Sequence, residues 1–140
     1  MAELLFETGI VEYKINGECT VKFNPTDINF IERVFDTFDS MDKKQEEYRG
    51  MVEANKENAA IFAAARKMDS EMREMLNGVF GCDVCSTLFG AMSVYAAAQG
   101  LPVWANLLLA VIDEMDGAFA REKKATNPRV QKYIDKYKKH

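Results

Sequence analysis

Residues 61–79 read IFAAARKMDSEMREMLNGV and carry apolar side chains at alternating intervals of four and three residues. The members of this series are Ile61, Ala65, Met68, Met72, Met75 and Val79. Such spacing places every member on one side of a helix and forms a seam along which two helices can pack. No proline interrupts residues 26–101, so the pattern also allows residues 42–77 to form one long helix. We therefore predict a mainly α-helical fold of about four to five helices.

A small β-hairpin is predicted ahead of the helices, at residues 10–23, which makes the expected class α+β. Apolar and polar residues alternate on both sides of Asn16-Gly17, as they do in two half-buried strands joined by a tight turn. We predict a three-residue loop over residues 15–17, because that loop sets Tyr13 opposite Cys19 and keeps the apolar side chains on one face. The loop glycine would then supply the left-handed residue of a bulged turn.

The first helix is predicted to start within residues 24–27, which read NPTD. Asn24 can cap a helix, Pro25 suits the first helical position, and Asp27 is favoured near the positive end of the helix. The apolar stripe that follows consists of Ile28, Ile31, Phe35 and Phe38, widened by Phe30, Val34 and Met41. A stripe of this width predicts a helix that contacts more than one neighbour.

Glycine and proline set the remaining boundaries. Gly78 and Gly81 are predicted to end the helix that holds the seam, and a short helix is predicted over about residues 83–98. Pro102 is predicted to open another helix over about residues 102–124, since proline is favoured at the start of a helix.

Composition indicates one globular domain over residues 1–140, with 48% apolar and 29% charged residues. Within it we expect a helical core at 25–124 and a basic helix or tail at 125–140. The first residues lack the basic region of a signal peptide, and no apolar run is long enough to span a bilayer. With no export signal and an odd number of cysteines, we expect a protein of the reducing cytoplasm. Because its apolar runs are short, we expect it not to enter a membrane.

Charge is distributed unevenly along the chain. Residues 1–120 hold 10 Lys/Arg and 20 Asp/Glu, a net charge of −10, whereas residues 121–140 hold 8 Lys/Arg and 2 Asp/Glu, a net charge of +6. A basic tail of this kind can bind nucleic acid, another acidic protein or the acidic body of its own chain. The tail also carries one apolar stripe, made of Val130, Tyr133, Ile134 and Tyr137. This stripe favours a docked amphipathic helix over a nucleic-acid-binding helix.

Two of the three cysteines form a C-x-x-C pair, Cys82 and Cys85. A zinc site needs four ligands, and the chain adds only Cys19 and the terminal His140 to the pair. A thioredoxin-like redox pair follows a strand in a βαβ unit, whereas a seam-bearing helix precedes this one. We therefore predict no metal site and interpret the pair as small apolar side chains at the start of a helix.

Carboxylates are plentiful but predict no catalytic site. Asp113, Glu114 and Asp116, like Glu46 and Glu47, lie on otherwise polar helix faces, with no histidine or glycine-rich phosphate loop nearby in the sequence. We interpret them as solvated faces and expect neither an enzyme nor a cofactor.

Methionine is common along the seam, at Met68, Met72 and Met75. Adaptable Met-rich surfaces often bind partners, but ordinary core packing explains the same pattern equally well. Trp104, close to Pro102, is predicted to lie in the core. The residues predicted to bind a partner or a second copy are Phe30, Ile31, Phe35, Met68, Met72 and Met75.

Two stretches together resemble a known family: residues 23–48, which begin FNPTDINFIERVF, and residues 76–90, which read LNGVFGCDVCSTLFG. The combination is similar to tail assembly chaperones encoded in the tail locus of long-tailed phages and prophages of Gram-positive bacteria. The resemblance covers roughly residues 10–115. It rests on Phe23-Asn24-Pro25, Asp27, Phe30, Arg33, Phe80-Gly81 and Phe89-Gly90. In that family the residues between the two Phe-Gly pairs are usually small and polar, so the two cysteines in this interval favour a packing or hinge role.

The resemblance implies a non-enzymatic role in virion morphogenesis. Such proteins are thought to coat the tape-measure protein, to recruit tail-tube subunits and to leave before the particle is complete. Self-association into rings or spirals is expected as well. Two alternatives stay open: a structural tail or head–tail connector component that is retained in the virion, and a nucleic-acid-binding regulator that uses the basic tail.

Overall fold

The computed structural model describes residues 1–54, 57–125, 129, 132 and 136 of the chain. These residues form a mainly helical protein with an N-terminal β-hairpin and four helices, which confirms the predicted fold class. In chain order the elements are β1 (Val11–Ile15), β2 (Cys19–Phe23), α1 (Ile28–Ala54), α2 (Asn58–Phe80), α3 (Cys85–Phe89), β3 (Ala97–Ala98), β4 (Leu101–Pro102) and α4 (Val103–Lys124). The prediction of a single domain over residues 1–140 stays a prediction, and the predicted stripe of Val130, Tyr133, Ile134 and Tyr137 lies outside the described residues.

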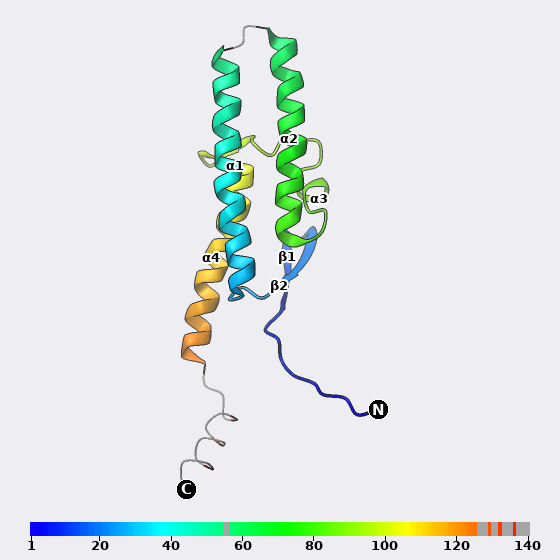
Figure 1. Ribbon diagram of the computed structural model, residues 1–140, viewed down its shortest axis with the longest axis vertical. Coiled ribbons are helices and arrows are strands. Elements are labelled where there is room, and N and C mark those ends of the chain that lie inside the picture. Colours follow the sequence, from blue (N-terminus) through cyan, green and yellow to red (C-terminus); the bar gives the residue numbers. More distant parts are fainter. Residues whose placement is uncertain (55–56, 126–128, 130–131, 133–135, 137–140) are drawn as a thin grey trace.

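The two longest helices, α1 and α2, lie side by side as a helical hairpin (Figure 1). Residues 42–77 are therefore not one continuous helix, because α1 ends at Ala54 and α2 begins at Asn58. Folding back lets the seam of α2 face the apolar stripe of α1, and Met68 and Met72 become buried. A single helix of the same sequence would have left both sets of side chains in water.

Helix α1 begins later than predicted, at Ile28. Asp27 caps it, since the Oδ1 atom of Asp27 accepts a hydrogen bond from the backbone N–H of Asn29 at 3.0 Å. Asn24 instead closes a turn before the helix, where its Oδ1 atom accepts from the backbone N–H of Thr26 at 2.8 Å. Asn24, the predicted cap, thus stabilises the turn, and Asp27 caps the helix in its place.

The buried stripe of α1 consists of Phe30, Val34 and Met41. Two members of the predicted primary stripe, Ile28 and Phe35, are exposed instead, with 69% and 47% of their surface in contact with solvent. Ile31 and Phe38 of that stripe do pack against the core, so the inward face of α1 is centred on Phe30, Val34 and Met41 rather than on Ile28 and Phe35.

The turn after α2 matches the prediction, and the segment beyond it does not. Gly81 ends α2 in a left-handed conformation, and its N–H donates to the carbonyl of Asn77 at 2.9 Å. The helix predicted over residues 83–98 is shortened to α3, which ends at Phe89. The backbone then runs without helix through a short β3–β4 turn before α4 begins at Val103, as expected for a helix opened by Pro102.

The predicted register of the β-hairpin is wrong. Ile15 pairs with Cys19, and Tyr13 pairs with Val21 rather than with Cys19. The loop is therefore residues 16–18, in which Asn16 and Gly17 both take positive φ angles, of 52° and 71°. Both registers keep apolar side chains on one face, so the turn geometry decided between them.

The core joins the hairpin, α1, α2 and α4. Phe23 of β2 stacks on Tyr13 and on Phe30, with ring centroids 4.5 and 4.2 Å apart. Trp104 at the start of α4 is 1% exposed, and its ring packs edge-on against the ring of Phe38 of α1, with ring centroids 5.1 Å apart. This confirms the prediction that Trp104 lies in the core.

Candidate interaction surfaces

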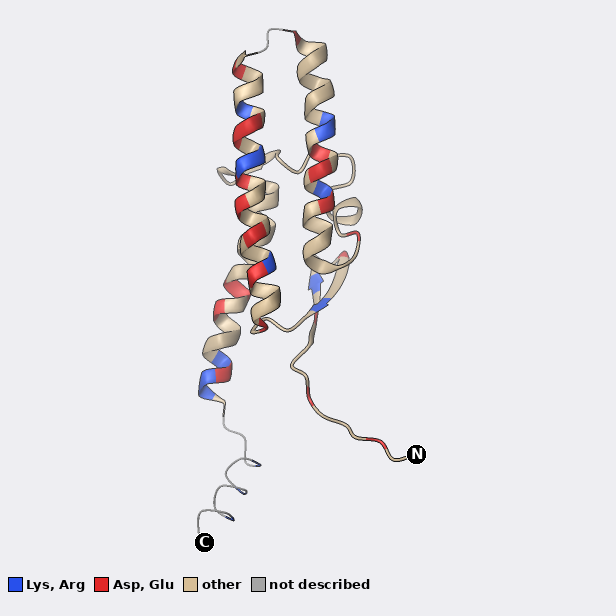
Figure 2. Cartoon of the chain, viewed as in Figure 1, with Lys and Arg blue, Asp and Glu red and all other residues tan. Residues whose placement is uncertain are grey.

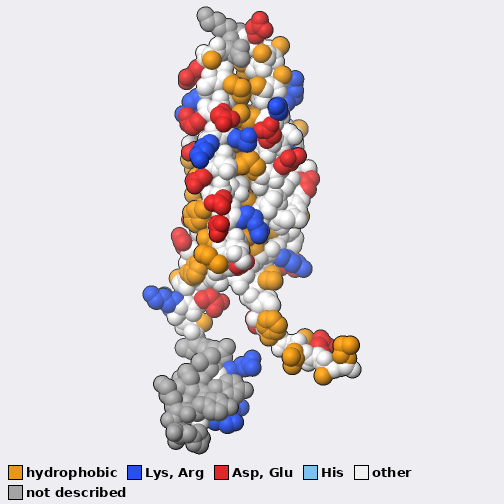
Figure 3. All heavy atoms as spheres, in the orientation of Figure 1, with side chains coloured by type: hydrophobic (Ala, Val, Ile, Leu, Met, Phe, Trp, Pro, Cys, Tyr) orange, Lys and Arg blue, Asp and Glu red, His pale blue; other side chains and the backbone are white. Residues whose placement is uncertain are grey.

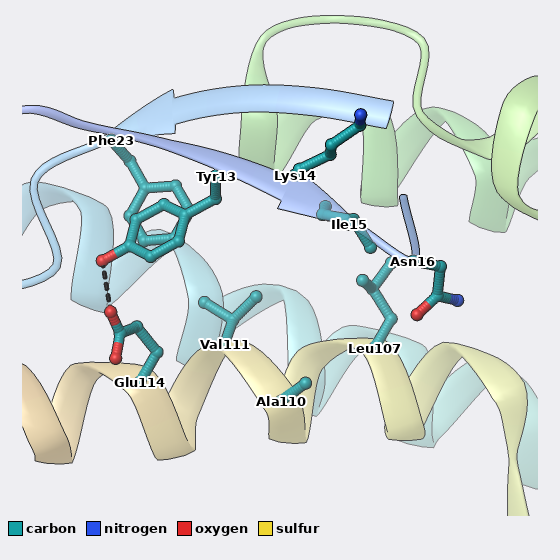
Figure 4. A pocket seen from close by; sticks show the side chains of 9 residues that line it. All are labelled: Tyr13, Lys14, Ile15, Asn16, Phe23, Leu107, Ala110, Val111 and Glu114. Carbon is teal, nitrogen blue, oxygen red and sulfur yellow. Dashed lines mark hydrogen bonds between the residues drawn. The ribbon is translucent and has the colours of Figure 1, made fainter. Parts of the chain in front are cut away.

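An apolar groove runs between strand β1 and helix α4 (Figure 4). It consists of two adjoining hollows of about 230 and 320 Å³, and Ile15, Asn16, Leu107 and Ala110 line both. The first hollow also reaches Val111, and the second reaches Leu88 and Phe89 around α3. We call these two hollows together the β1–α4 groove. Its lining is mostly apolar side chain, which suits an apolar occupant better than a polar one.

One end of the β1–α4 groove is closed by a polar contact (Figure 4). The hydroxyl of Tyr13 donates to Oε2 of Glu114 at 2.5 Å, and Nη2 of Arg121 donates to the same oxygen at 3.0 Å. Burial, together with this hydrogen bond, raises the pKa of Tyr13 to about 12. The Tyr13 hydroxyl and Arg121 both lower the pKa of Glu114. The interpretation of Glu114 as part of a solvated helix face is therefore wrong, since its carboxylate accepts from Tyr13 and so joins the β-hairpin to α4.

The distal part of the α1–α2 helical hairpin, residues 49–54 and 58–64, is the second candidate surface. None of the described residues between Met41 and Met68 is buried. Met51 and Ile61 are only half-buried, and Figure 3 shows apolar side chains between the two helices on this face. Nearer the other end, the 90–102 segment covers the helical hairpin: the ring centroids of Tyr95 and Tyr48 lie 4.7 Å apart, and the Tyr95 hydroxyl donates to the carbonyl of Ala65. Helix α4 covers it as well, where Trp104 donates to the side chain of Gln45. The distal part is thus a two-helix layer that lacks a third helix.

The six residues predicted to bind a partner fall into two groups. Phe30, Met68 and Met72 are buried, at 4%, 6% and 0% exposure, and they form part of the hydrophobic core. Ile31 and Met75 are half-buried and pack against that core, and Phe35 is the exposed member. Their role in partner binding stays a prediction. Of the six, Phe35 has the largest exposed fraction.

An N-terminal arm, residues 1–10, is a third surface, one that the sequence reasoning missed. Leu4, Leu5 and Phe6 are 94%, 85% and 80% exposed, and Figure 3 shows apolar side chains on this arm away from the helices. The signal was three consecutive large apolar residues between Glu3 and Glu7, in a segment with no predicted strand or helix.

The cysteine pair lies at the corner between α2 and α3. Cys82 is exposed and Cys85 is buried, and both are free thiols, as is the half-buried Cys19. The side chain of Asn77 organises this corner, because its Oδ1 atom accepts from the backbone N–H groups of Val84 and Cys85 at 2.9 and 3.1 Å. Burial raises the pKa of Cys85 to about 11 and also raises the pKa of Cys19.

The three thiols are expected to differ sharply in reactivity toward a thiol reagent such as DTNB at pH 8. Cys82 should react first, because it is exposed, whereas Cys85 should react only as fast as the protein opens, since burial disfavours its thiolate. Mass spectrometry of the partly labelled protein identifies the modified residue. A Cys82→Ser variant is the control and should lose the fast phase alone. A fast phase that persists in this variant would contradict the assignment.

Charges are spread over the outer faces of α1 and α2, where Asp and Glu alternate with Lys and Arg (Figure 2). In the part of the chain that the structure describes, no group of three or more His, Cys, Asp or Glu side chains is placed to hold a metal ion. Nor does this part contain a helix both long and apolar enough to cross a bilayer. Comparison with family models, with curated proteins and with solved structures found no match for the chain.

Proposed function

We propose that the chain is a phage tail assembly chaperone, or a related tail-morphogenesis factor, that works without catalysis in the cytoplasm of the bacterial host. The observation that carries the proposal is the distal part of the α1–α2 hairpin, which has apolar side chains but no buried residue among those described. A single amphipathic helix laid along it would cover Met51, Ile61 and Phe62 and complete a three-helix core. Such a surface fits a helical client.

The resemblance to tail assembly chaperones supplies the class of client. A tape-measure protein offers long amphipathic helices that need cover before the tail tube surrounds them, and the distal part of the hairpin presents apolar side chains that one such helix would cover. Charges of both signs lie beside this surface on α1, whereas residues 58–65 of α2 carry none and are followed by the basic Arg66 and Lys67. Tail-tube subunits are the second proposed partner.

The test is co-expression of the chain with the tape-measure protein of the same phage or prophage. We expect a soluble complex that co-purifies, and we expect Phe62→Asp to weaken it by roughly tenfold or more, because a charge would enter the apolar contact. Phe62 is 59% exposed, so the substitution should leave folding intact. Phe35 lies on α1 outside the distal part, so Phe35→Asp tests separately whether the client also contacts the exposed member of the predicted set.

Phe119→Asp is the matched control, since Phe119 is 49% exposed and lies on α4, away from the distal part of the hairpin. It should bind the tape-measure protein as the unsubstituted chain does. Failure of the unsubstituted chain to bind, or equal loss in all three variants, would overturn the proposal. Detection of the chain in purified virions would instead favour a structural component of the tail or connector.

A further inference from the structure

The N-terminal arm exposes three large apolar side chains next to one another. Leu4, Leu5 and Phe6 are consecutive and almost fully in water. Large apolar groups exposed together mark a contact surface in soluble proteins, whereas single exposed ones are common. Among the described residues, nothing of the same chain covers these three side chains.

The base of the arm is held firmly against the body. The side-chain amide of Asn24 donates from Nδ2 to the carbonyl of Thr8 at 2.9 Å. Gly9, at φ +74°, makes this approach possible, because a Cβ atom there would lie 2.7 Å from the same Nδ2 atom. This contact ties the base of the arm to the body, and Figure 1 shows the arm running away from the helices rather than back along them.

The β1–α4 groove offers an apolar surface of the matching kind. Among the described residues, β1 pairs with β2 alone, so β1 has one edge without a strand partner. In an extended segment alternate side chains point the same way, so an arm lying along this edge would direct Leu4 and Phe6 to one side and Leu5 to the other. The two adjoining hollows can receive these two side chains. Lys14 at the rim complements the acidic Glu3.

We propose that the N-terminal arm of one copy docks in the β1–α4 groove of a second copy, with Leu4 and Phe6 in the two hollows. The arm cannot serve its own groove without breaking the Asn24–Thr8 bond and reversing at Gly9, so the occupant comes from another chain. Each copy offers one arm and one groove. Exchange of arms therefore closes a dimer, and head-to-tail docking builds a ring or an open chain. This inference does not depend on the phage role proposed above.

The first test measures the mass of the full chain over a wide concentration range by sedimentation velocity, with any purification tag at the C-terminal end. We expect reversible self-association in the unsubstituted chain. The double variant Leu4→Ala/Phe6→Ala should weaken it by roughly a hundredfold, because two large apolar side chains no longer leave water. Leu5→Ala is the matched control and should associate normally. A chain that stays monomeric up to near-millimolar concentration, or equal losses in both variants, would overturn the proposal.

The second test approaches the contact from the groove. Ala110 is exposed and lines both hollows, so Ala110→Phe should fill the groove without disturbing the core. This variant alone should be as monomeric as the arm variant. A mixture of the two contains one intact arm and one intact groove, and it is expected to form heterodimers. A mixture that remains monomeric would refute arm docking, whatever the cause of association in the unsubstituted chain.

Discussion

Replacing Trp104 by alanine is expected to lower the free energy of unfolding by about 4 kcal/mol, a large part of the stability of a domain of this size. Trp104 is 1% exposed and lies where α4 meets α1. Its ring contacts Phe38 edge-on at 5.1 Å, and its Nε1–H donates to Oε1 of Gln45 at 3.1 Å. Alanine would leave a cavity and remove the contact that fastens α4 to the helical hairpin.

Urea denaturation followed by far-ultraviolet circular dichroism measures this loss. Trp104 is the only tryptophan in the chain, so tryptophan fluorescence cannot follow the variant. Trp104→Phe is the control, and it should lose only about 1–2 kcal/mol, because it retains most of the packing and gives up the hydrogen bond. A loss below 1 kcal/mol for the alanine variant would mean that α4 is held mainly by other contacts.

The sequence predicted the elements whose signal is local. The part of the seam from Met68 to Val79 is confirmed as the inner face of α2, and Gly81 ends that helix because only a left-handed residue closes the turn cheaply. The fold-back between α1 and α2 was not predictable in the same way. Residues 42–77 are compatible with one helix, and the burial gained by folding back is a property of the whole chain.

The β-hairpin shows a second limit of prediction from the sequence. The alternation of residues in β1 and β2 correctly predicted which side chains face the core. It could not decide whether Tyr13 pairs with Cys19 or with Val21, because both are apolar. The conformation of Asn16-Gly17 selects the observed register, which also brings Tyr13, Phe23 and Phe30 into one stack. Pattern therefore determines the face of a strand more reliably than its register.

The candidate surfaces were predicted in part. Exposure separates Phe35 from Phe30, although both lie on α1 and both are apolar, because α1 packs with a different side inward than the periodicity indicated. The arm was missed because Leu4, Leu5 and Phe6 belong to no regular element. A search for periodic apolar residues cannot detect a surface in a segment whose apolar residues follow no period.

Arg73→Ala is expected to lower the free energy of unfolding by about 3 kcal/mol, since several hydrogen bonds to one charged group disappear together. Its guanidinium donates to Oδ2 of Asp69 at 3.0 Å and to the carbonyls of Gly90 and Met92 at 2.7 and 2.6 Å. Asp69 in turn accepts from the N–H of Val94 at 2.7 Å. Both side chains are about one-fifth exposed, at 19% and 20%.

This network explains why residues 90–96 are not helical, although the sequence there contains good helix formers. Backbone groups that a helix would pair internally are taken by side chains of α2, four residues apart on one helix face. In Arg73→Ala we therefore expect faster amide hydrogen exchange at Val94 and its neighbours, as well as lower stability. Arg73→Lys should recover little, because an ammonium cannot reach the carboxylate and two carbonyls in the geometry of the guanidinium fork.

Arg49→Ala provides the comparison for the network around Arg73. Arg49 pairs with Glu46 within α1 at 2.9 Å, but both side chains are more than half exposed, and solvent screens the attraction. That variant should change the unfolding free energy by less than about 0.5 kcal/mol. Similar losses for Arg49→Ala and Arg73→Ala would show that the 90–96 segment is held by burial of Val94 and Tyr95 rather than by the charges of α2. The difference between the two variants therefore measures what partial burial and the two carbonyl hydrogen bonds together add to an ion pair that spans one turn of a helix.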